Sequence, residues 1–258
     1  MFDLHGKVTV VTGGTAGLGK GMAIALARQG ADLALLARRP DKLRAAAAEI
    51  ESLGVQCLPV ECDVTSDESV NAALKAVLDR YGKVDILVNN AGNGGPAIPT
   101  TEMPQATFEK VMGLDLCGVF RMLRVFGKPM VEAGYGRVIN IGSAMGLVGN
   151  MDLPLSGYQA AKGGVINLTR GVAAEWAPKG VTVNCICPGT FPSESNDEKM
   201  MRENEEFVQK TIPMRRPGRP TSLNTVGDMD AAVVFLSSEE AAFVTGVILP
   251  VDGGWTCV

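Results

Sequence analysis

The chain has 258 residues, of which 46% are hydrophobic and 20% charged, and its formal net charge is −4. This composition is typical of a soluble globular protein and argues against a polyanion such as nucleic acid as a partner. No apolar segment reaches the ~18 residues that a membrane-spanning helix needs, and no basic region precedes the first apolar run. We therefore expect a cytoplasmic protein with no membrane and no nucleic-acid partner.

Apolar runs of strand length alternate with segments of helical period along the whole chain. Strands are expected at 8–11, 33–36, 57–60, 84–88, 137–141, 181–186 and 247–251. Helices are expected at 17–29, 41–53, 66–81, 108–132, 158–176 and 228–236. Strict alternation predicts a doubly wound, Rossmann-like α/β fold, with about seven parallel strands and helices on both faces.

One long stretch, 188–227, breaks this rhythm and is rich in Pro, Met and charges of both signs. Long irregular segments inside a compact domain are usually functional, so we expect a substrate lid at about 190–226. A mobile surface loop is the alternative interpretation.

A glycine-rich turn joins the first expected strand to the first expected helix. Its residues are Gly13, Thr15, Ala16, Gly17, Leu18 and Gly19. Glycines in this position let the backbone approach a pyrophosphate, which then lies at the positive end of the helix dipole. We therefore expect these six residues to bind a dinucleotide and residues 1–258 to form a single dinucleotide-binding catalytic domain.

The end of the second strand indicates which dinucleotide is preferred. Proteins that bind NAD usually place an acidic residue there for the ribose hydroxyls. This chain has Ala37, Arg38 and Arg39 instead, and guanidinium groups pair with a 2′-phosphate. We expect NADP(H) to be favoured over NAD(H); two solvated arginines at a helix start are the alternative.

Polar residues also follow the third and fourth strands, at the sheet edge where open α/β folds bind ligands. Asp63 and Val64 follow the third strand, and Asn90 and Gly92 follow the fourth. We expect all four to contact the cofactor, with Asp63 accepting a hydrogen bond from the adenine amino group. Asn89 and Asn90 are alternatively turn residues that tolerate unusual backbone angles.

Tyr158 and Lys162 are four residues apart on an expected helix, so their side chains share one face. Ser143 ends the fifth strand. An ammonium beside a phenol favours the phenolate, which would make Tyr158 an acid and base for a proton transfer. The alternative is a surface tyrosine and a surface lysine on an amphipathic helix.

Together these motifs resemble the short-chain dehydrogenase/reductase family over nearly the whole chain. They are Thr12-Gly13-Gly14-Thr15-Ala16-Gly17-Leu18-Gly19, Asp63-Val64, Asn89-Asn90-Ala91-Gly92, Ser143, Tyr158-x-x-x-Lys162, Pro188-Gly189 and Val251-Asp252-Gly253-Gly254. The resemblance implies hydride transfer between a nicotinamide and a ketone or secondary alcohol. It makes Tyr158 the general acid and base, places Lys162 on the nicotinamide ribose, and places Ser143 on the substrate oxygen.

The resemblance also implies that Pro188 and Gly189 contact the cofactor. Ser193 stands where the family usually has a threonine that bonds the nicotinamide carboxamide, and Phe191 would lie close to the same ring.

Asp115 stands where many family members carry an asparagine that holds a water in a proton relay to the active-site lysine. We count Asp115 among the catalytic residues. A carboxylate near Lys162 is expected to raise the pKa of the lysine and to be able to carry protons itself.

No metal site is expected, because the six cysteines lack metal-ligand spacing and His5 is the only histidine. Several cysteines lie in expected strands, where a thiol behaves as a small hydrophobic group. Many members of the family pair their two longest helices, here 108–132 and 158–176, so the resemblance implies a homotetramer, or a dimer.

Apolar residues surround the expected substrate entrance. They are Met145, Leu147, Val148, Met151, Leu153, Leu155, Phe191, Met200, Met201, Phe207, Ile212 and Met214. These favour a bulky apolar or cyclic ketone or alcohol. The alternatives are a 3-oxoacyl-[acyl-carrier-protein] reductase, a sugar or polyol dehydrogenase of the gluconate type, and a catalytically silent NADP-binding sensor or scaffold.

Overall fold

Seven parallel strands form one sheet in the order β3-β2-β1-β4-β5-β6-β7. The computed structural model describes residues 1–149, 153–192 and 198–258, with the backbone alone for 198–204. The strands are β1 (Val8–Thr12), β2 (Asp32–Ala37), β3 (Cys57–Glu61), β4 (Ile86–Asn89), β5 (Gly136–Ile141), β6 (Val181–Pro188) and β7 (Ile248–Val251). Those at the centre are buried along their whole length, which explains why their sequences are largely apolar.

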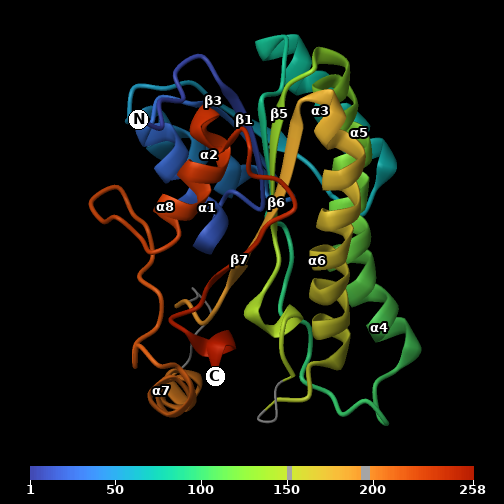
Figure 1. The fold of residues 1–258 in the computed structure, drawn as a ribbon, viewed down its shortest axis with the longest axis vertical. Helices are drawn as coiled ribbons and strands as arrows, with labels where there is room; N and C mark the ends of the chain where they lie inside the picture. The colour runs from blue at the N-terminus through green and yellow to red at the C-terminus, as the bar shows by residue number, and fades with distance from the viewer. Residues whose placement is uncertain (150–152, 193–197) are drawn as a thin grey trace.

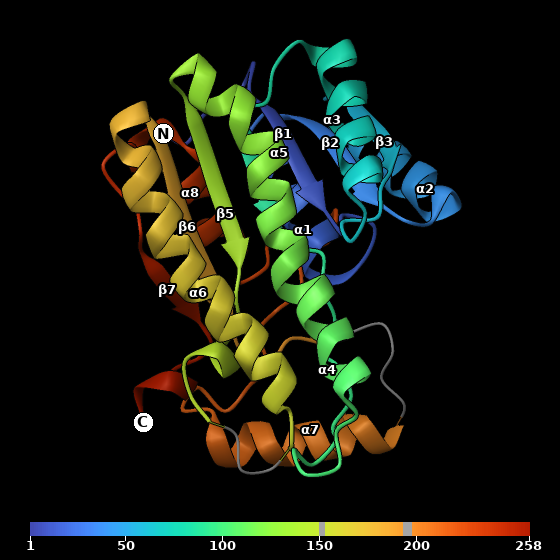
Figure 2. The ribbon, with the colours of Figure 1, turned by 90° about the vertical axis from the view of Figure 1, so that its right-hand side faces the viewer.

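Helices cover both faces of the sheet, which confirms the doubly wound fold (Figures 1 and 2). One face carries α1 (Gly17–Arg28), α2 (Pro40–Glu51) and α8 (Asp230–Ser237). The other carries α3 (Asp67–Tyr81), α5 (Gly118–Ala133) and α6 (Ser156–Trp176). Each face buries its own apolar core, one around Phe126 and Met122, the other around Leu26 and Leu35.

The expected helix 108–132 is interrupted in the structure. It consists of α4 (Gln105–Met112), a π-helical turn (Gly113–Cys117) and α5. Turns of this kind are rare and frequently lie at functional sites, because the extra residue redirects a side chain. Here the turn contains Asp115, which is fully buried.

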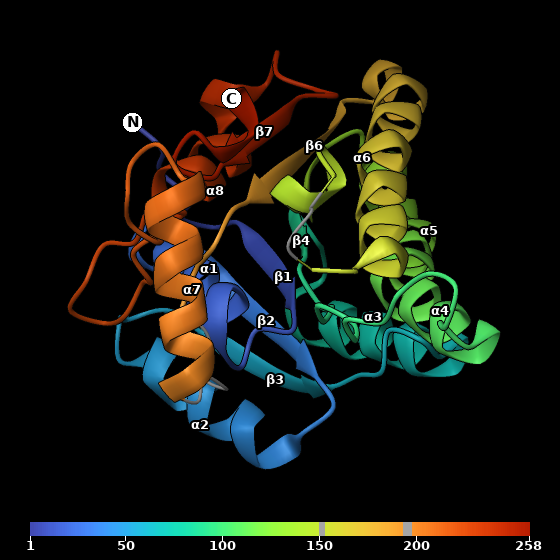
Figure 3. The ribbon, with the colours of Figure 1, turned by 90° about the horizontal axis from the view of Figure 1, so that it is seen from below.

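The expectation of an irregular segment at 188–227 is wrong, because this stretch contains helix α7 (Glu198–Thr211). Val208 and Ile212 lie four residues apart on one buried face, and the Phe207 ring meets the Trp255 ring edge-on at 5.1 Å. Because α7 has many charged residues, the sequence shows little of this short apolar stripe, and no helix was expected here. Figures 2 and 3 show α7 crossing the end of the molecule toward which the strands point.

No helix within the described residues is long and apolar enough to cross a membrane.

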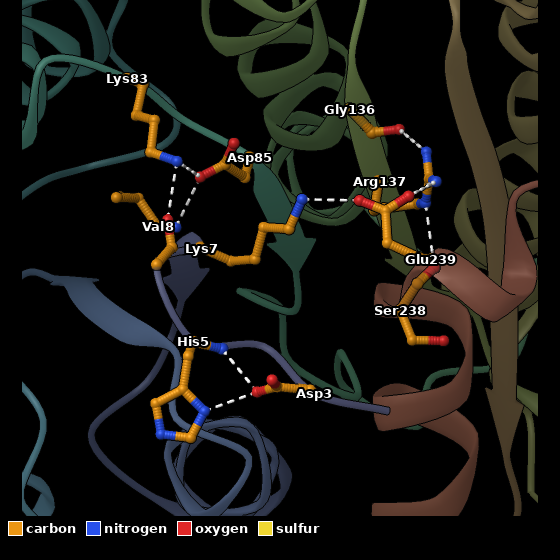
Figure 4. A network of polar contacts seen from close by, with 11 residues as sticks. Asp3, His5, Lys7, Val8, Lys83, Asp85, Gly136, Arg137, Ser238 and Glu239 are labelled. Carbon is orange, nitrogen blue, oxygen red and sulfur yellow. Dashed lines mark hydrogen bonds and ion pairs between the residues drawn. The ribbon is translucent and has the colours of Figure 1, made fainter. Parts of the chain in front are cut away.

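A polar network joins the amino end of the sheet to the segment after α8 (Figure 4). The Arg137 side chain is 4% exposed, and its Nη2 atom lies 3.0 Å from Glu239 Oε2. Its Nε atom donates a hydrogen bond to the Ser238 carbonyl. Lys7 Nζ lies 2.6 Å from Glu239 Oε1. Both cations also lie over the Tyr135 ring. Glu239 therefore ties three distant parts of the chain together.

Replacing Glu239 by glutamine should lower the free energy of unfolding by about 1 kcal/mol, because a half-exposed carboxylate contributes modestly even when it pairs with a buried guanidinium. Urea denaturation measures this difference. Glu102→Gln, at an exposed position, is the matched control and should change nothing measurable.

This difference should also depend on pH. The Lys7 ammonium is the main cause that holds the pKa of Glu239 below its usual range. A carboxyl group whose pKa is lower in the folded protein stabilises the fold at pH values above its unfolded-state pKa of about 4.3. This contribution disappears as the pH falls through the pKa of the folded state. A variant as stable as the wild type at neutral pH would contradict this account.

Candidate active site

A cavity of about 840 Å³ opens at the carboxyl ends of the strands, and it gathers the residues that the sequence singled out. These are Gly13, Thr15, Ala16, Gly17, Leu18, Gly19, Arg38, Arg39, Asp63, Val64, Asn90, Gly92, Asp115, Ser143, Tyr158, Lys162, Pro188, Gly189 and Phe191. Ser193 lies outside the described residues. The cavity lies where the strand order reverses between β1 and β4, the usual ligand position in such folds.

The glycine turn leaves the first backbone N–H groups of α1 available to an anion. Gly13 and Gly17 adopt positive φ angles of 66° and 51°, which other residues rarely adopt. Ala16 caps the helix without a side-chain hydrogen bond, and the first turn carries no acidic residue. At Gly19 an added Cβ would lie 2.3 Å from both Asn90 Nδ2 and the Gly13 oxygen. This cradle fits the pyrophosphate of a dinucleotide.

Arg38 and Arg39 are exposed at the rim of this cavity, directly after β2. Asp63 lies near them after β3. Its Oδ1 accepts hydrogen bonds from the Thr65 hydroxyl and amide at 2.7 and 2.9 Å. These bonds, with a smaller contribution from Arg38, hold the pKa of Asp63 below its usual range. The rim thus combines two guanidinium groups with one fixed carboxylate.

The two asparagines after β4 have different surroundings. Asn90 lines the cavity, and its amide and side chain donate to the Thr12 hydroxyl and carbonyl at 2.9 and 3.0 Å. Asn89 is buried within the sheet and donates to Asn140 Oδ1 at 2.9 Å. Asn90 therefore joins the ends of β1 and β4, and Asn89 connects β4 to β5.

Ser143, Tyr158 and Lys162 meet at the end of β5. Ser143 is 8% exposed, and its Oγ accepts a hydrogen bond from the Met145 amide at 3.1 Å. Lys162 is 4% exposed; its Nζ donates to the Ile141 carbonyl at 2.9 Å and lies 5.7 Å from the centre of the Tyr158 ring. The structure therefore excludes a solvated helix face for this pair.

Burial dominates the proton chemistry of the tyrosine. It raises the pKa of Tyr158, and a hydrogen bond with Ser143 opposes this only in part. In the protein alone, the expected stabilisation of the Tyr158 phenolate by Lys162 is therefore smaller than the effect of burial. A cationic group bound beside the phenol would add the missing stabilisation.

Asp115 lies beside the lysine, with its Oδ1 3.7 Å from Lys162 Nζ. The same oxygen accepts a hydrogen bond from the Asn93 amide at 3.0 Å. The carboxylate itself acts on the pKa of Lys162 in the expected direction, upward, but it is not the largest influence. Burial lowers the pKa of Lys162 by more than Asp115 raises it, and burial also raises the pKa of Asp115.

Two groups at this site escaped the sequence reasoning, the amide of Asn93 and the carbonyl of Ile141. Both are backbone groups, which any residue carries, so no sequence signal points to them. The tertiary fold alone brings them to Asp115 and Lys162.

Several residues expected at the substrate entrance instead fill a small core. Met145, Phe207 and Ile212 pack with Ala144 and Trp255. The exposed apolar side chains near the entrance are Leu147, Leu153 and Met214. The expected position Met151 and the side chains of Met200 and Met201 lie outside the described residues.

The described residues contain no group of three or more His, Cys, Asp or Glu side chains that could hold a metal ion. Four cysteines are buried (Cys57, Cys62, Cys185 and Cys187), and two are exposed (Cys117 and Cys257). Burial raises the pKa of Cys57 to about 12 and that of Cys62 to about 11. These two thiols therefore stay protonated and structural.

Comparison with known proteins agrees with this geometry. The family model described as "Enoyl-(Acyl carrier protein) reductase" matches residues 13–256. A 2-dehydro-3-deoxy-L-rhamnonate dehydrogenase (NAD(+)) from Sphingomonas sp. is 37% identical over 97% of this chain and 96% of its own. Levodione reductase from Leifsonia aquatica is 35% identical over 96% of this chain and 93% of its own.

A solved short-chain type dehydrogenase/reductase from Mycobacterium marinum is 32% identical and superposes with a TM-score of 0.92, over 100% of this chain and 98% of its own. Family model, curated relatives and solved structure agree over almost the full length of the chain. The protein therefore belongs to the short-chain dehydrogenase/reductase family and is an NAD(P)-dependent oxidoreductase that acts on CH–OH groups.

Proposed function

We propose that the protein is an NADP(H)-dependent reductase of ketones and dehydrogenase of secondary alcohols, built as one catalytic domain. The observation that carries this proposal is the placement of Ser143, Tyr158 and Lys162 around the same cavity as the glycine turn and Arg38. A proton donor is thus available in the cavity that suits a dinucleotide.

A nicotinamide bound in this cavity would supply a hydride to a carbonyl carbon, or accept one from an alcohol. Ser143 holds the substrate oxygen by a hydrogen bond, and Tyr158 gives that oxygen its proton or takes it back in the reverse direction. Lys162, held by the Ile141 carbonyl, would bind the nicotinamide ribose. Phe191 and Pro192 line the cavity at the start of the proposed lid.

The substrate we propose is a bulky, largely apolar or cyclic ketone or alcohol. The exposed side chains of Leu147, Leu153 and Met214 support an apolar contact surface. A second cavity of about 350 Å³ lies behind Phe191 and is lined in part by Ile212, Met214 and Val251. Because the relatives named above include both a sugar-type dehydrogenase and a reductase, oxidation of a sugar or polyol is the second candidate.

Reduction of acyl chains on a carrier protein is less well supported. An acidic carrier needs accessible basic side chains, and Arg137 at the start of β5 is buried and paired with Glu239. A silent sensor is disfavoured because all three reacting side chains line the cavity.

Replacing Tyr158 by phenylalanine should lower kcat at least ~100-fold and leave the affinity for NADPH unchanged, because only the proton donor is lost. The assay follows nicotinamide absorbance over a panel of ketones and alcohols. Tyr81→Phe is the matched control, since Tyr81 bonds a backbone carbonyl of β2, and should retain activity. A wild-type protein that binds NADPH but turns over no member of the panel would favour the sensor.

Replacing Arg38 by alanine should raise the Michaelis constant for NADPH about tenfold, the cost of one charge-assisted hydrogen bond, and leave that for NADH unchanged. Arg44→Ala is the matched control, because Arg44 is an exposed arginine on α2 paired with Asp41. An unchanged NADPH constant in Arg38→Ala would refute the assignment of a phosphate to this rim.

We also propose a homotetramer, in which α5 contributes to one subunit contact. Phe120 on α5 is 51% exposed, although it is a large apolar side chain. Phe120→Glu should reduce the mass measured by light scattering at micromolar concentration, while the exposed Val226→Glu should not. A monomeric wild type would rule the assembly out.

A further inference from the structure

A carboxyl group lies beneath the reacting side chains, in contact with the catalytic lysine. Asp115 is 0% exposed and Lys162 is 4% exposed. The two charged ends, Oδ1 and Nζ, are 3.7 Å apart. Ion pairs withdrawn from water in this way are costly, and each partner then depends strongly on the other for its protonation state.

Both partners are held in place by backbone groups from different elements. The Asn93 amide donates to Asp115 Oδ1 at 3.0 Å, and Lys162 Nζ donates to the Ile141 carbonyl at 2.9 Å. Gly92 closes the other side, since an added Cβ there would lie 2.4 Å from the same Oδ1. Oδ1 therefore lies between the Asn93 amide, Gly92 and the lysine.

The second carboxyl oxygen, Oδ2, is buried and has no hydrogen-bond partner among the described residues. A buried oxygen without a partner is costly when it carries charge, so it favours a carboxyl that takes up a proton. Burial acts in the same direction, because it raises the pKa of Asp115 and lowers that of Lys162.

Carboxylate with ammonium, and carboxylic acid with amine, are two arrangements of the same single proton. Both have a net charge of zero. An uncharged amide at position 115 would instead leave the positive charge of Lys162 without a counterion. The side chain at position 115 therefore decides how much positive charge acts on the nearby phenol.

The other titratable groups that face the pair come from two elements. Tyr158 lies on α6, with its ring centre 5.7 Å from Lys162 Nζ. Cys185 and Cys187 on β6 act on the lysine, and their sulfurs are 3.8 Å apart and hydrogen-bonded to each other. Of these groups, Tyr158 is the one that exchanges a proton in the proposed reaction.

We propose that Asp115 is a positioning residue that cancels the charge of Lys162 and thereby raises the pH at which Tyr158 loses its proton. The consequence for catalysis rests on the proposed function, in which Tyr158 is the acid and base. Charge cancellation itself rests only on the positions of these three side chains. Alcohol oxidation, which needs the phenolate, is then displaced toward alkaline pH.

Titration of the tyrosinate ultraviolet absorbance tests this directly, with and without NADP⁺. The chain has three tyrosines, so the signal of Tyr158 is the difference between each protein and its Tyr158→Phe counterpart. Asp115→Asn, which keeps the shape and removes the charge, should lower the Tyr158 midpoint by about one pH unit, a tenfold change in proton affinity. An unchanged or raised midpoint would overturn the proposal.

Asp79→Asn is the matched control, because it removes an exposed carboxylate from α3 and should leave the midpoint unchanged. Lys162→Gln is a second variant that does not depend on the folding of Asp115→Asn. It removes the cation and leaves the carboxyl group, so the Tyr158 midpoint should rise. A fall in this variant would contradict the proposal.

The pH profile of kcat for alcohol oxidation separates this proposal from the proposed function. In Asp115→Asn the acidic limb of the profile should move to lower pH with the tyrosine midpoint. Turnover with an unmoved midpoint would refute charge cancellation and leave the function intact. A moved midpoint in a protein that turns over no ketone or alcohol would refute the function and support charge cancellation.

Discussion

The pairing of β1 with β4 is the constraint on which the rest of this molecule depends. These two strands are neighbours in the sheet although two strands and three helices separate them in the chain. The Thr12 hydroxyl, at the end of β1, accepts hydrogen bonds from the Asn90 and Ala91 amides that follow β4. From β1 the chain builds the sheet outward on one side, through β2 and β3, and from β4 it builds outward on the other side. The cavity opens at the carboxyl ends of the strands, where this order reverses.

Burial controls the chemistry of the groups that this cavity brings together. Ser143, Lys162 and Asp115 are nearly inaccessible to water, so each group is governed by a few fixed partners. Asp115 accepts a hydrogen bond from a backbone amide and Lys162 donates one to a backbone carbonyl, which keeps the two side chains together where solvation is lost. The protonation of Tyr158 follows from the charge of its neighbours and from its own desolvation.

The fold could be predicted from the sequence because its signals are local. Largely apolar runs placed β1, β5 and β6 to within one or two residues, because both faces of a central parallel strand are buried. Helix α7 was missed because its buried stripe is short and half of its residues are charged. The interruption between α4 and α5 was missed because a π-helical turn has no simple sequence pattern.

The candidate site was predicted only as a set of residues. The ordered motifs around Gly13, Asn90 and Tyr158 were enough to indicate a dinucleotide and a proton transfer. The motifs did not predict the sign of the pKa shift of Lys162, because that sign depends on burial, which the sequence does not give directly. The effects of neighbouring charge and of desolvation oppose each other, and only the structure shows which is larger.

The sequence by itself therefore determined the order of the seven strands and of the helices that cover the sheet, the chemical groups available and, through its ordered motifs, the class of reaction. These follow from local pattern and residue type. The tertiary structure alone decided that the Asn93 amide and the Ile141 carbonyl meet Asp115 and Lys162. It also decided that Arg137 is withdrawn from the surface. The physical reason is that burial and partner geometry arise from contacts between residues far apart in the chain.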